Sequence, residues 1–190
     1  MVTAGNLIAL GAVQQGFHAL SIPSFGGERR GAPAKSSVRI SDSPILLRCD
    51  VTTADILLMC DSSVWRYSDF LSNLRDGALL IFNSSLSVET LEKELKSGKF
   101  PSILRIEHNR IITINATALA MKKLGRPIFN TALMGAFAAA SSLISLDTVK
   151  SLIKDHFTGS GEVNSELAEA AYNEVLGQMG GKPWELKMDT

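Results

Sequence analysis

The sequence predicts a three-layer α/β/α single domain with a mostly parallel central sheet and a helical C-terminal third. Two short, continuous apolar runs, residues 56–60 (ILLMC) and 78–82 (ALLIF), are typical of strands buried on both faces, and a helical pattern follows each. Strands that alternate with helices favour a parallel sheet. With 190 residues, 45% of them hydrophobic, the chain has enough apolar material for one domain with a sizeable core.

The N-terminal elements follow from local patterns. Residues 2–16 combine small and apolar side chains in a helix that can approach a sheet closely, and residues 17–22 form a short strand candidate. Residues 34–40 alternate between two faces, which predicts a half-exposed strand, and residues 45–49 suggest a further short strand. The segment 23–33 (PSFGGERRGAP) is too rich in glycine and proline to lie inside an element.

The middle and the end of the chain complete the pattern. Serines after Asp61 and Asn83 can cap helices, and Asn115 caps a helix that Gly125 and Pro127 close. The expected helices are 64–74, 88–96, the one after Asn115, 131–143, 146–157 and 163–178, and the remaining expected strands are 103–106 and 110–114. The domain is expected to span 1–178, with 179–190 as a C-terminal tail.

Composition excludes several classes of partner and site. Formal net charge is zero, so no nucleic-acid or anionic membrane surface is expected. The sequence has no apolar run of about 18 residues and no basic start of a signal peptide, which predicts a cytoplasmic protein. Cys49 and Cys60 are the only cysteines, and three scattered histidines accompany them, so we expect reduced cysteines and no bound metal.

Two segments carry candidate contacts to a ligand. Arg29 and Arg30 lie on the glycine-flanked loop after Ser24, where guanidinium groups can bind a carboxylate or a phosphate. The alternative is that both arginines pair with acidic groups of a partner subunit or of the fold itself. In the segment 127–138 (PIFNTALMGAFA), Asn130 can cap a helix whose N-terminus, with Thr131, faces an anion. An ordinary cap on a buried helix is the alternative there.

Catalytic motifs are lacking. The sequence has no nucleophile elbow, Walker loop, HExxH or CxxC motif, and Gly159-Ser160-Gly161 lies between helices rather than after a strand. A nucleophile pair of Ser24 and His18 has no evident third orienting group. No catalytic residue is therefore expected in this chain.

The same segments carry a family resemblance that runs over nearly the whole chain. PSFGGERRGAP at 23–33, VRISDSPI at 38–45, LGRPIFNTALMGAFA at 124–138 and the opening VTAGNLIALGAV resemble the gamma subunit of pyruvate-type 2-oxoacid:ferredoxin oxidoreductases. The resemblance implies an enzyme that oxidatively decarboxylates a 2-oxoacid with coenzyme A, giving acyl-CoA and CO2 and reducing ferredoxin. It implies thiamine diphosphate in the alpha and beta subunits and iron–sulfur clusters in beta and delta. The chain alone would hold no cofactor and be inactive.

Within such an enzyme we expect substrate or coenzyme A contacts from Ser24, Arg29, Arg30, Asn130 and Thr131. One departure qualifies the resemblance: family members begin with a strand and a G-x-G-G-Q-G loop before the first helix, whereas this sequence starts at Met1 beside that helix. Loss of that strand would leave an open sheet edge. The alternatives are that the start codon is misassigned, or that the assembly supplies the strand or dispenses with it. The remaining alternatives are a stand-alone α/β module that binds an anion or a nucleotide, and an independent hydrolase or transferase.

Overall fold

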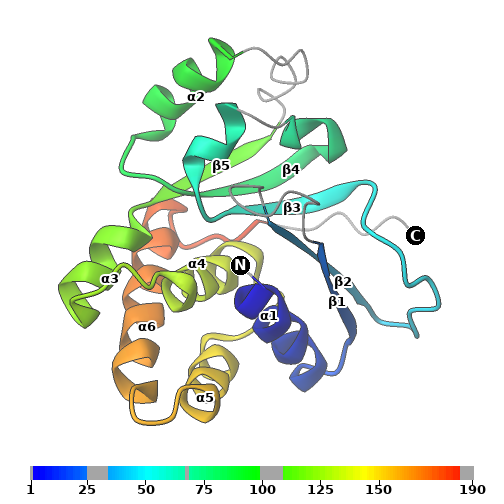
Figure 1. Ribbon diagram of the computed structural model, residues 1–190, viewed down its shortest axis with the longest axis vertical. Helices are drawn as coiled ribbons and strands as arrows, with labels where there is room; N and C mark the ends of the chain where they lie inside the picture. The colour runs from blue at the N-terminus through cyan, green and yellow to red at the C-terminus, as the bar shows by residue number, and fades with distance from the viewer. Residues whose placement is uncertain (1, 25–33, 67–68, 99–108, 185–190) are drawn as a thin grey trace.

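The computed structural model describes residues 2–24, 34–66, 69–98 and 109–184 and has three layers (Figure 1). A sheet lies in the middle, α2 covers one face, and α3, α4 and α6 cover the other. The helices are α1 (Val2–Gln14), α2 (Val88–Lys96), α3 (Ala116–Leu124), α4 (Asn130–Ser141), α5 (Leu146–His156) and α6 (Gly161–Gln178). The strands are β1 (His18–Ser24), β2 (Lys35–Ser41), β3 (Ala54–Met59), β4 (Leu74–Asn83) and β5 (Arg110–Ile114). The predicted α/β class is confirmed.

The central sheet is parallel, with the order β3-β4-β5. The middle strand β4 is buried on both faces: Leu79 and Ile81 pack toward the helical layer, while Leu80 and Phe82 pack toward α2. This double burial explains the continuous apolar run at 78–82, because no position in that part of the strand faces water.

The α2 side of the sheet has its own small core. Leu91 and Leu95 of α2 are fully buried there, four residues apart on one helical face. Trp65 and Leu71 from the chain between β3 and β4 join them. Ser87 caps α2 by accepting a hydrogen bond from the backbone N–H of Thr90, so the helix begins where the sequence predicts.

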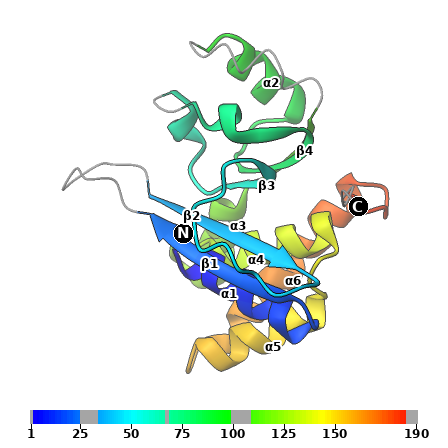
Figure 2. The ribbon, with the colours of Figure 1, turned by 90° about the vertical axis from the view of Figure 1, so that its right-hand side faces the viewer.

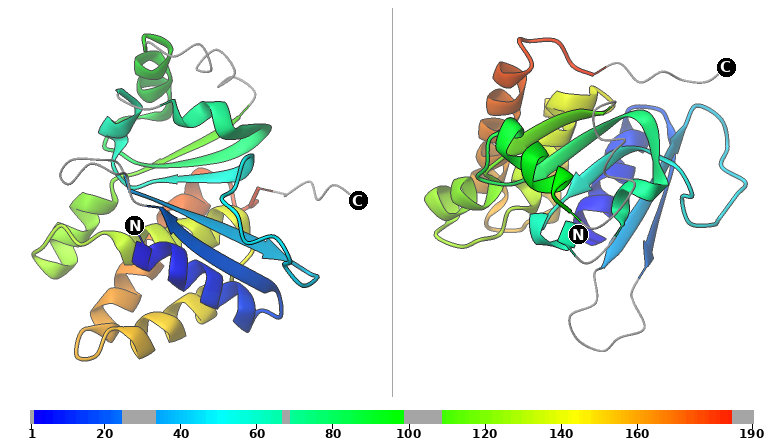
Figure 3. Two further views of the ribbon diagram at one scale, coloured as in Figure 1. Left: turned by 45° about the vertical axis from the view of Figure 1, so that its right-hand side comes forward. Right: turned by 90° about the horizontal axis from the view of Figure 1, so that it is seen from above.

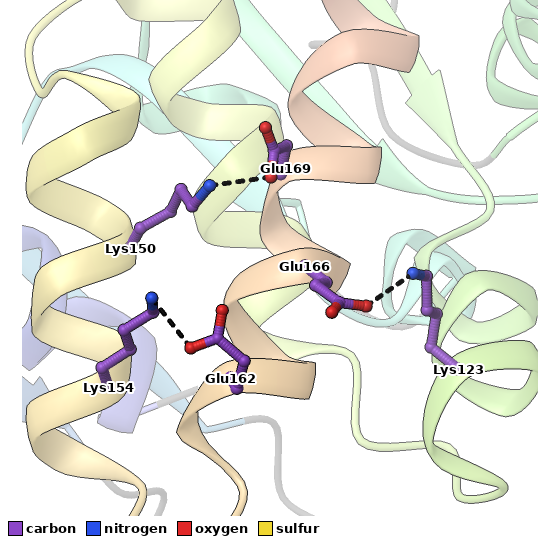
Figure 4. Close-up of polar contacts among 6 residues, drawn as sticks. All are labelled: Lys123, Lys150, Lys154, Glu162, Glu166 and Glu169. Atoms are coloured by element: carbon purple, nitrogen blue, oxygen red, sulfur yellow. Dashed lines mark hydrogen bonds and ion pairs between the residues drawn. The ribbon is translucent and has the colours of Figure 1, made fainter.

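The other side of the sheet is a layer of closely packed helices. The buried residues of α4 run from Thr131 to Ser141, and most of them are small. Gly135 lies against the backbone of Ala168 on α6, where a side chain would overlap the Ala168 carbonyl group. Three ion pairs join the outer face of α6 to its neighbours (Figure 4). They are Lys123–Glu166 from α3, and Lys150–Glu169 and Lys154–Glu162 from α5.

The strands β1 and β2 form a separate antiparallel ribbon that lies beside α1 (Figure 2). Val38 and Ile40 of β2 pack against the core of the helical layer, as the alternating pattern predicts. In the part of the chain that the structure describes, β3 pairs only with β4 and is an edge strand. Figure 3 shows this ribbon beside α1, with α2 at the far end of the molecule.

Two predicted elements were wrong. Residues 64–74 do not form one α-helix but parts of two short 3₁₀ helices, η1 (Ser62–Arg66) and η2 (Phe70–Asn73), followed by the start of β4. The hydroxyl of Ser72 donates to the carbonyl of Asp69, a local bond of the kind that competes with α-helix formation.

Residues 45–49 form a loop rather than a strand, with Leu46 89% exposed. The end of this loop is held on β2 instead, because Asp50 bonds both Lys35 and Ser37. Without a partner strand, the apolar residues of the loop have no ladder to join. The predicted strand at 103–106 lies outside the described residues.

The sequence analysis also expected reduced cysteines and no membrane-spanning segment. Cys49 and Cys60 are both free thiols, the first exposed and the second buried, where burial raises the pKa of the Cys60 thiol. Among the helices that the structure describes, none combines the length and the apolar character needed to cross a bilayer.

Candidate functional site

A cavity of about 410 Å³ lies at the carboxyl ends of β3, β4 and β5. In open parallel sheets this end is the usual place for a ligand, because the connecting loops diverge there. Residues that follow each strand line the cavity, together with residues of α2. They are Ser62, Ser63 and Trp65 after β3, Asn83, Ser84, Ser85, Leu86, Leu91 and Glu94 from β4 through α2, and Asn115 and Thr117 after β5.

Asn83 holds this end of the sheet together. Its side chain is nearly buried, and its amide nitrogen donates to the carbonyl of Cys60 at 3.0 Å and to Oγ1 of Thr117 at 2.9 Å. Its amide oxygen accepts from the backbone N–H of Thr117 at 3.3 Å. One amide thus ties the end of β3, the end of β4 and the start of α3, which fixes the shape of the cavity wall.

Three N–H groups in the first turns of the two helices that begin beside the cavity are bonded within the chain. In α3, the side chain of Asn115 accepts a hydrogen bond from the N–H of Ala118 at 2.9 Å. The side chain of Asn83 accepts one from the N–H of Thr117. In α2, Ser87 accepts from the N–H of Thr90. An anion at either helix end would have to displace these bonds.

Two carboxylates, Glu94 in the lining and Asp61 next to it, place negative charge at the cavity. Among its described lining residues Glu94 is the one that carries a charge, and none is a lysine, arginine or histidine. Asp61, adjacent to the lining, accepts from the backbone and hydroxyl of Ser63, and these bonds lower the pKa of its carboxyl group. Within the described ranges no three His, Cys, Asp or Glu side chains gather closely enough to hold a metal ion. The arrangement suits binding of an uncharged polar group.

Of the residues proposed from the sequence, those that the structure describes do not line the cavity. Ser24 is the last residue of β1, half-exposed, and is paired across the ribbon with Lys35. Arg29 and Arg30 lie outside the described residues. Asn130 is the first residue of α4 and is half-buried, but Phe129 occupies the cap position, so the predicted capping role of Asn130 was wrong.

Thr131 is fully buried. Its hydroxyl donates to Oδ1 of Asn164 on α6 at 3.1 Å, and the amide of Asn164 donates to the carbonyl of Ser160 at 2.9 Å. The threonine therefore contributes to the contact between two helices. No hydrogen bond or ion pair of the described residues joins Thr131 or Asn130 to Ser24.

The residues that line the cavity were not predicted from the sequence. The serines after Asp61 and Asn83 suggested only helix caps, a role that Ser87 does fill. The available signal was positional: polar residues directly after successive parallel strands meet at one edge of the sheet. The partnership of Asn83 with Thr117, 34 residues apart, has no local signature.

Comparison with known proteins identifies the family. A family model described as pyruvate ferredoxin/flavodoxin oxidoreductase matches residues 1–174. The chain is 35% identical to the pyruvate/ketoisovalerate oxidoreductases common subunit gamma of Thermococcus kodakarensis, over 92% of this chain and 90% of that protein. It is 37% identical to pyruvate synthase subunit PorC of Methanothermobacter thermautotrophicus, over 92% of this chain and 88% of that protein.

Solved structures share the fold. A pyruvate oxidoreductase subunit PORC from Thermotoga maritima superposes with a TM-score of 0.73 at 21% identity, covering 90% of this chain and 88% of that one. A 2-oxoglutarate:ferredoxin oxidoreductase from Magnetococcus marinus, solved with 2-oxoglutarate, coenzyme A and succinyl-CoA bound, gives 0.66 at 19% identity, covering 99% of this chain and 30% of that one. The resemblance drawn from the sequence is thereby confirmed, and the chain belongs to the pyruvate ferredoxin/flavodoxin oxidoreductase family, among relatives that are gamma, or PorC, subunits.

Proposed function

We propose that the chain is the gamma subunit of a pyruvate-type 2-oxoacid:ferredoxin oxidoreductase. In this reaction the bond between the carboxyl and carbonyl carbons of the 2-oxoacid breaks, CO2 leaves, the acyl group is transferred to the thiol of coenzyme A, and two electrons reduce ferredoxin. The observation that carries the proposal is similarity along the full length of gamma subunits, with about nine-tenths of each chain aligned.

The division of labour in the proposed complex follows from the ligands that this chain lacks. An iron–sulfur cluster is usually held by about four cysteine thiolates. The sequence has two cysteines, one buried and one exposed, so its residues do not fit such a cluster. We place thiamine diphosphate in the alpha and beta partners and the iron–sulfur clusters in beta and delta. We place the complex in the cytoplasm, where a reducing environment suits free thiols.

The role of this chain is then to complete the binding surface for coenzyme A or the 2-oxoacid. Ser24, Arg29 and Arg30, on and beside the glycine-flanked loop, are the proposed contacts to the anionic groups of these substrates. Asn130 would form a second wall, and the buried Thr131 would position α4 behind it through Asn164.

Reconstitution tests the proposal. The chain is expressed with the alpha, beta and delta subunits of its own source, and pyruvate-dependent reduction of a viologen dye is followed with coenzyme A present. We expect activity in the four-subunit preparation and none from this chain alone. Stable assembly without activity towards pyruvate or any branched-chain or dicarboxylic 2-oxoacid would contradict the proposal, as would dye reduction by the isolated chain.

The arginine contacts have a sharper test in the same preparation. Loss of a charge-assisted hydrogen bond weakens binding by roughly tenfold or more, so Arg30→Ala should raise the KM for coenzyme A or for the 2-oxoacid by that factor. Arg126→Ala, an exposed arginine after α3, is the matched control and should change neither constant. An unchanged KM for both substrates in Arg30→Ala would show that this arginine has a structural role.

A further inference from the structure

The loop between β2 and β3 exposes two neighbouring leucines to solvent. Leu46 is 89% exposed and Leu47 65%, the highest values among the large apolar side chains of the described residues. Residues 44–48 have no regular secondary structure, and in the described chain no hydrogen bond joins their backbone to other backbone groups. Figure 3 shows the chain between β2 and β3 projecting from the body of the molecule. Neighbouring apolar side chains on a projecting surface indicate contact with another molecule.

Both ends of this loop are bonded to β2. At the first end, the backbone N–H of Ser43 donates to Oγ of Ser41, the last residue of β2, at 3.2 Å. At the second end, the carboxylate of Asp50 pairs with Lys35 at 2.6 Å and accepts from the hydroxyl of Ser37 at 2.6 Å. A loop whose ends are held in the free chain loses less conformational entropy when it binds a partner.

Two arginines beside the leucines have no carboxylate partner among the described residues. Arg48 follows Leu47 directly and is exposed. Arg39 of β2 reaches the end of the loop, where its guanidinium contacts the carbonyl of Cys49 at 3.5 Å and the sulfur of Cys49 at 3.9 Å. Nε of Arg39 is buried without a hydrogen-bond partner. The nearby carboxylate, Asp50, is already bonded to β2, so the loop combines apolar surface with positive charge.

This combination defines the chemistry of what covers the loop. A guanidinium binds a carboxylate through two parallel hydrogen bonds, and leucines fit an apolar pocket. A second copy of this chain would fit poorly, because a symmetric contact brings the same patch against itself and sets Arg48 near the arginines of the other copy. A different chain that offers both a pocket and a carboxylate matches the loop.

We propose that residues 44–49, the docking loop, bind a partner subunit of the oxidoreductase. The partner surface offers an apolar pocket to Leu46 and Leu47 and a carboxylate at the edge of that pocket to Arg48. That the partner is an oxidoreductase subunit rests on the proposed function, whereas the pocket and the carboxylate rest on the loop alone.

The two cysteines provide a direct probe of the docking loop. Cys49 is exposed at its end, and Cys60 is buried in the core. A maleimide should label Cys49 of the free chain and spare Cys60. In the assembled four-subunit preparation, labelling of Cys49 should be at least tenfold slower, as mass spectrometry of the peptides that contain each cysteine would measure.

The outcomes separate this proposal from the proposed function. An assembled, active complex in which Cys49 is labelled as fast as in the free chain would overturn the docking loop, while the function stands. An assembled complex that protects Cys49 but oxidises no 2-oxoacid would refute the function and leave the docking loop in place.

An apolar-to-charged substitution measures the contribution of the leucines. Leu46→Asp would place a carboxylate in the apolar pocket, so the complex should dissociate at a concentration about a hundredfold higher, as mass photometry of diluted samples would show. Met121→Asp is the matched control: Met121 is 48% exposed on α3, on the other side of the molecule in Figure 1. It should assemble as the parent does. Equal dissociation of Leu46→Asp and the parent would overturn the proposal.

Two substitutions of Arg48 test the carboxylate of the partner. Arg48→Gln removes the charge and should raise the dissociation concentration about tenfold, and Arg48→Glu, which sets two carboxylates against each other, should raise it about tenfold further. Equal dissociation of the two variants would mean that the partner offers no carboxylate there.

Sedimentation of the free chain tests the alternative occupant. We expect a monomer at micromolar concentration. A dimer that Leu46→Asp dissociates would show that the loop binds a second copy of this chain and would overturn the assignment to a partner subunit.

Discussion

In the α4–α6 pair, small side chains let two helices touch backbone to backbone, whereas at the carboxyl end of the sheet polar side chains surround a cavity. Gly135 and Ala168 mark the first region, and Asn83 the second. The two regions are held together in different ways: the helices interlock by shape, while the sheet end is held by directional hydrogen bonds. The close-packed pair leaves no space for a ligand, whereas the sheet end borders the cavity.

The largest effect is expected where the helices touch. Gly135→Ala would place a methyl group on the Ala168 carbonyl, and because backbone cannot move aside cheaply, we expect the free energy of unfolding to fall by about 3 kcal/mol. Gly177→Ala, on α6 with open space around it, is the control and should raise stability by up to about 1 kcal/mol through helix propensity. Urea unfolding followed by circular dichroism measures both. Equal effects would mean that the two helices are not in close contact.

The next effect is expected at the sheet end. Asn83→Ala would leave the Cys60 carbonyl and the Thr117 N–H without their partners, which should lower the free energy of unfolding by about 2 kcal/mol. Asn115→Ala removes a cap on the more exposed rim and should lower it by about 1 kcal/mol, and Asn115→Gly by a few tenths. The same urea titrations apply. A smaller loss for Asn83→Ala than for Asn115→Ala would show that the cavity wall is not held by Asn83.

The sequence predicted some elements of the fold better than others. Helices 88–96 and 116–124 begin and end as expected because their signals are local: Ser87 and Asn115 cap the first turns, and Gly125 takes a left-handed conformation with φ of 65°. The same local reading failed at 45–49 and 64–74. The end of the 45–49 loop is held on β2 by the ion pair of Asp50 with Lys35. The segment 64–74 runs into β4, which begins at Leu74.

The candidate site was the least predictable part. The three strands that lead to it were predicted, two of them from apolar runs, but the bonds of Asn83 to Cys60 and Thr117 join segments 23 and 34 residues away. Such a contact exists only once the strand order β3-β4-β5 is known. The loop arginines were singled out because two adjacent charges stand between glycines, and their contacts stay a prediction.

The smallest effect is expected on the outer face of the helical layer, where Lys150 and Glu169 join α5 to α6 (Figure 4). The hydrogen bond to Lys150 lowers the pKa of the Glu169 carboxyl group, and the same bond raises the pKa of the Lys150 ammonium group. A carboxyl with a lowered pKa in the folded state stabilises the fold above its ordinary pKa, about 4.3, and that contribution is lost as pH falls through the lowered value. The ammonium contribution is instead present below about 10.4 and is lost as pH rises through the raised value.

Glu169→Gln should therefore lower the melting temperature slightly at pH 7 and lose its difference from the parent chain in the acid range below the carboxyl pKa. Because the pair is partly exposed, 1 M salt should also reduce the difference at pH 7. Melting curves of both chains across pH 2–7, with and without salt, are the measurement. If the Glu169→Gln difference equalled that of Gly135→Ala, charge pairing rather than interlocking shape would hold the helical layer together.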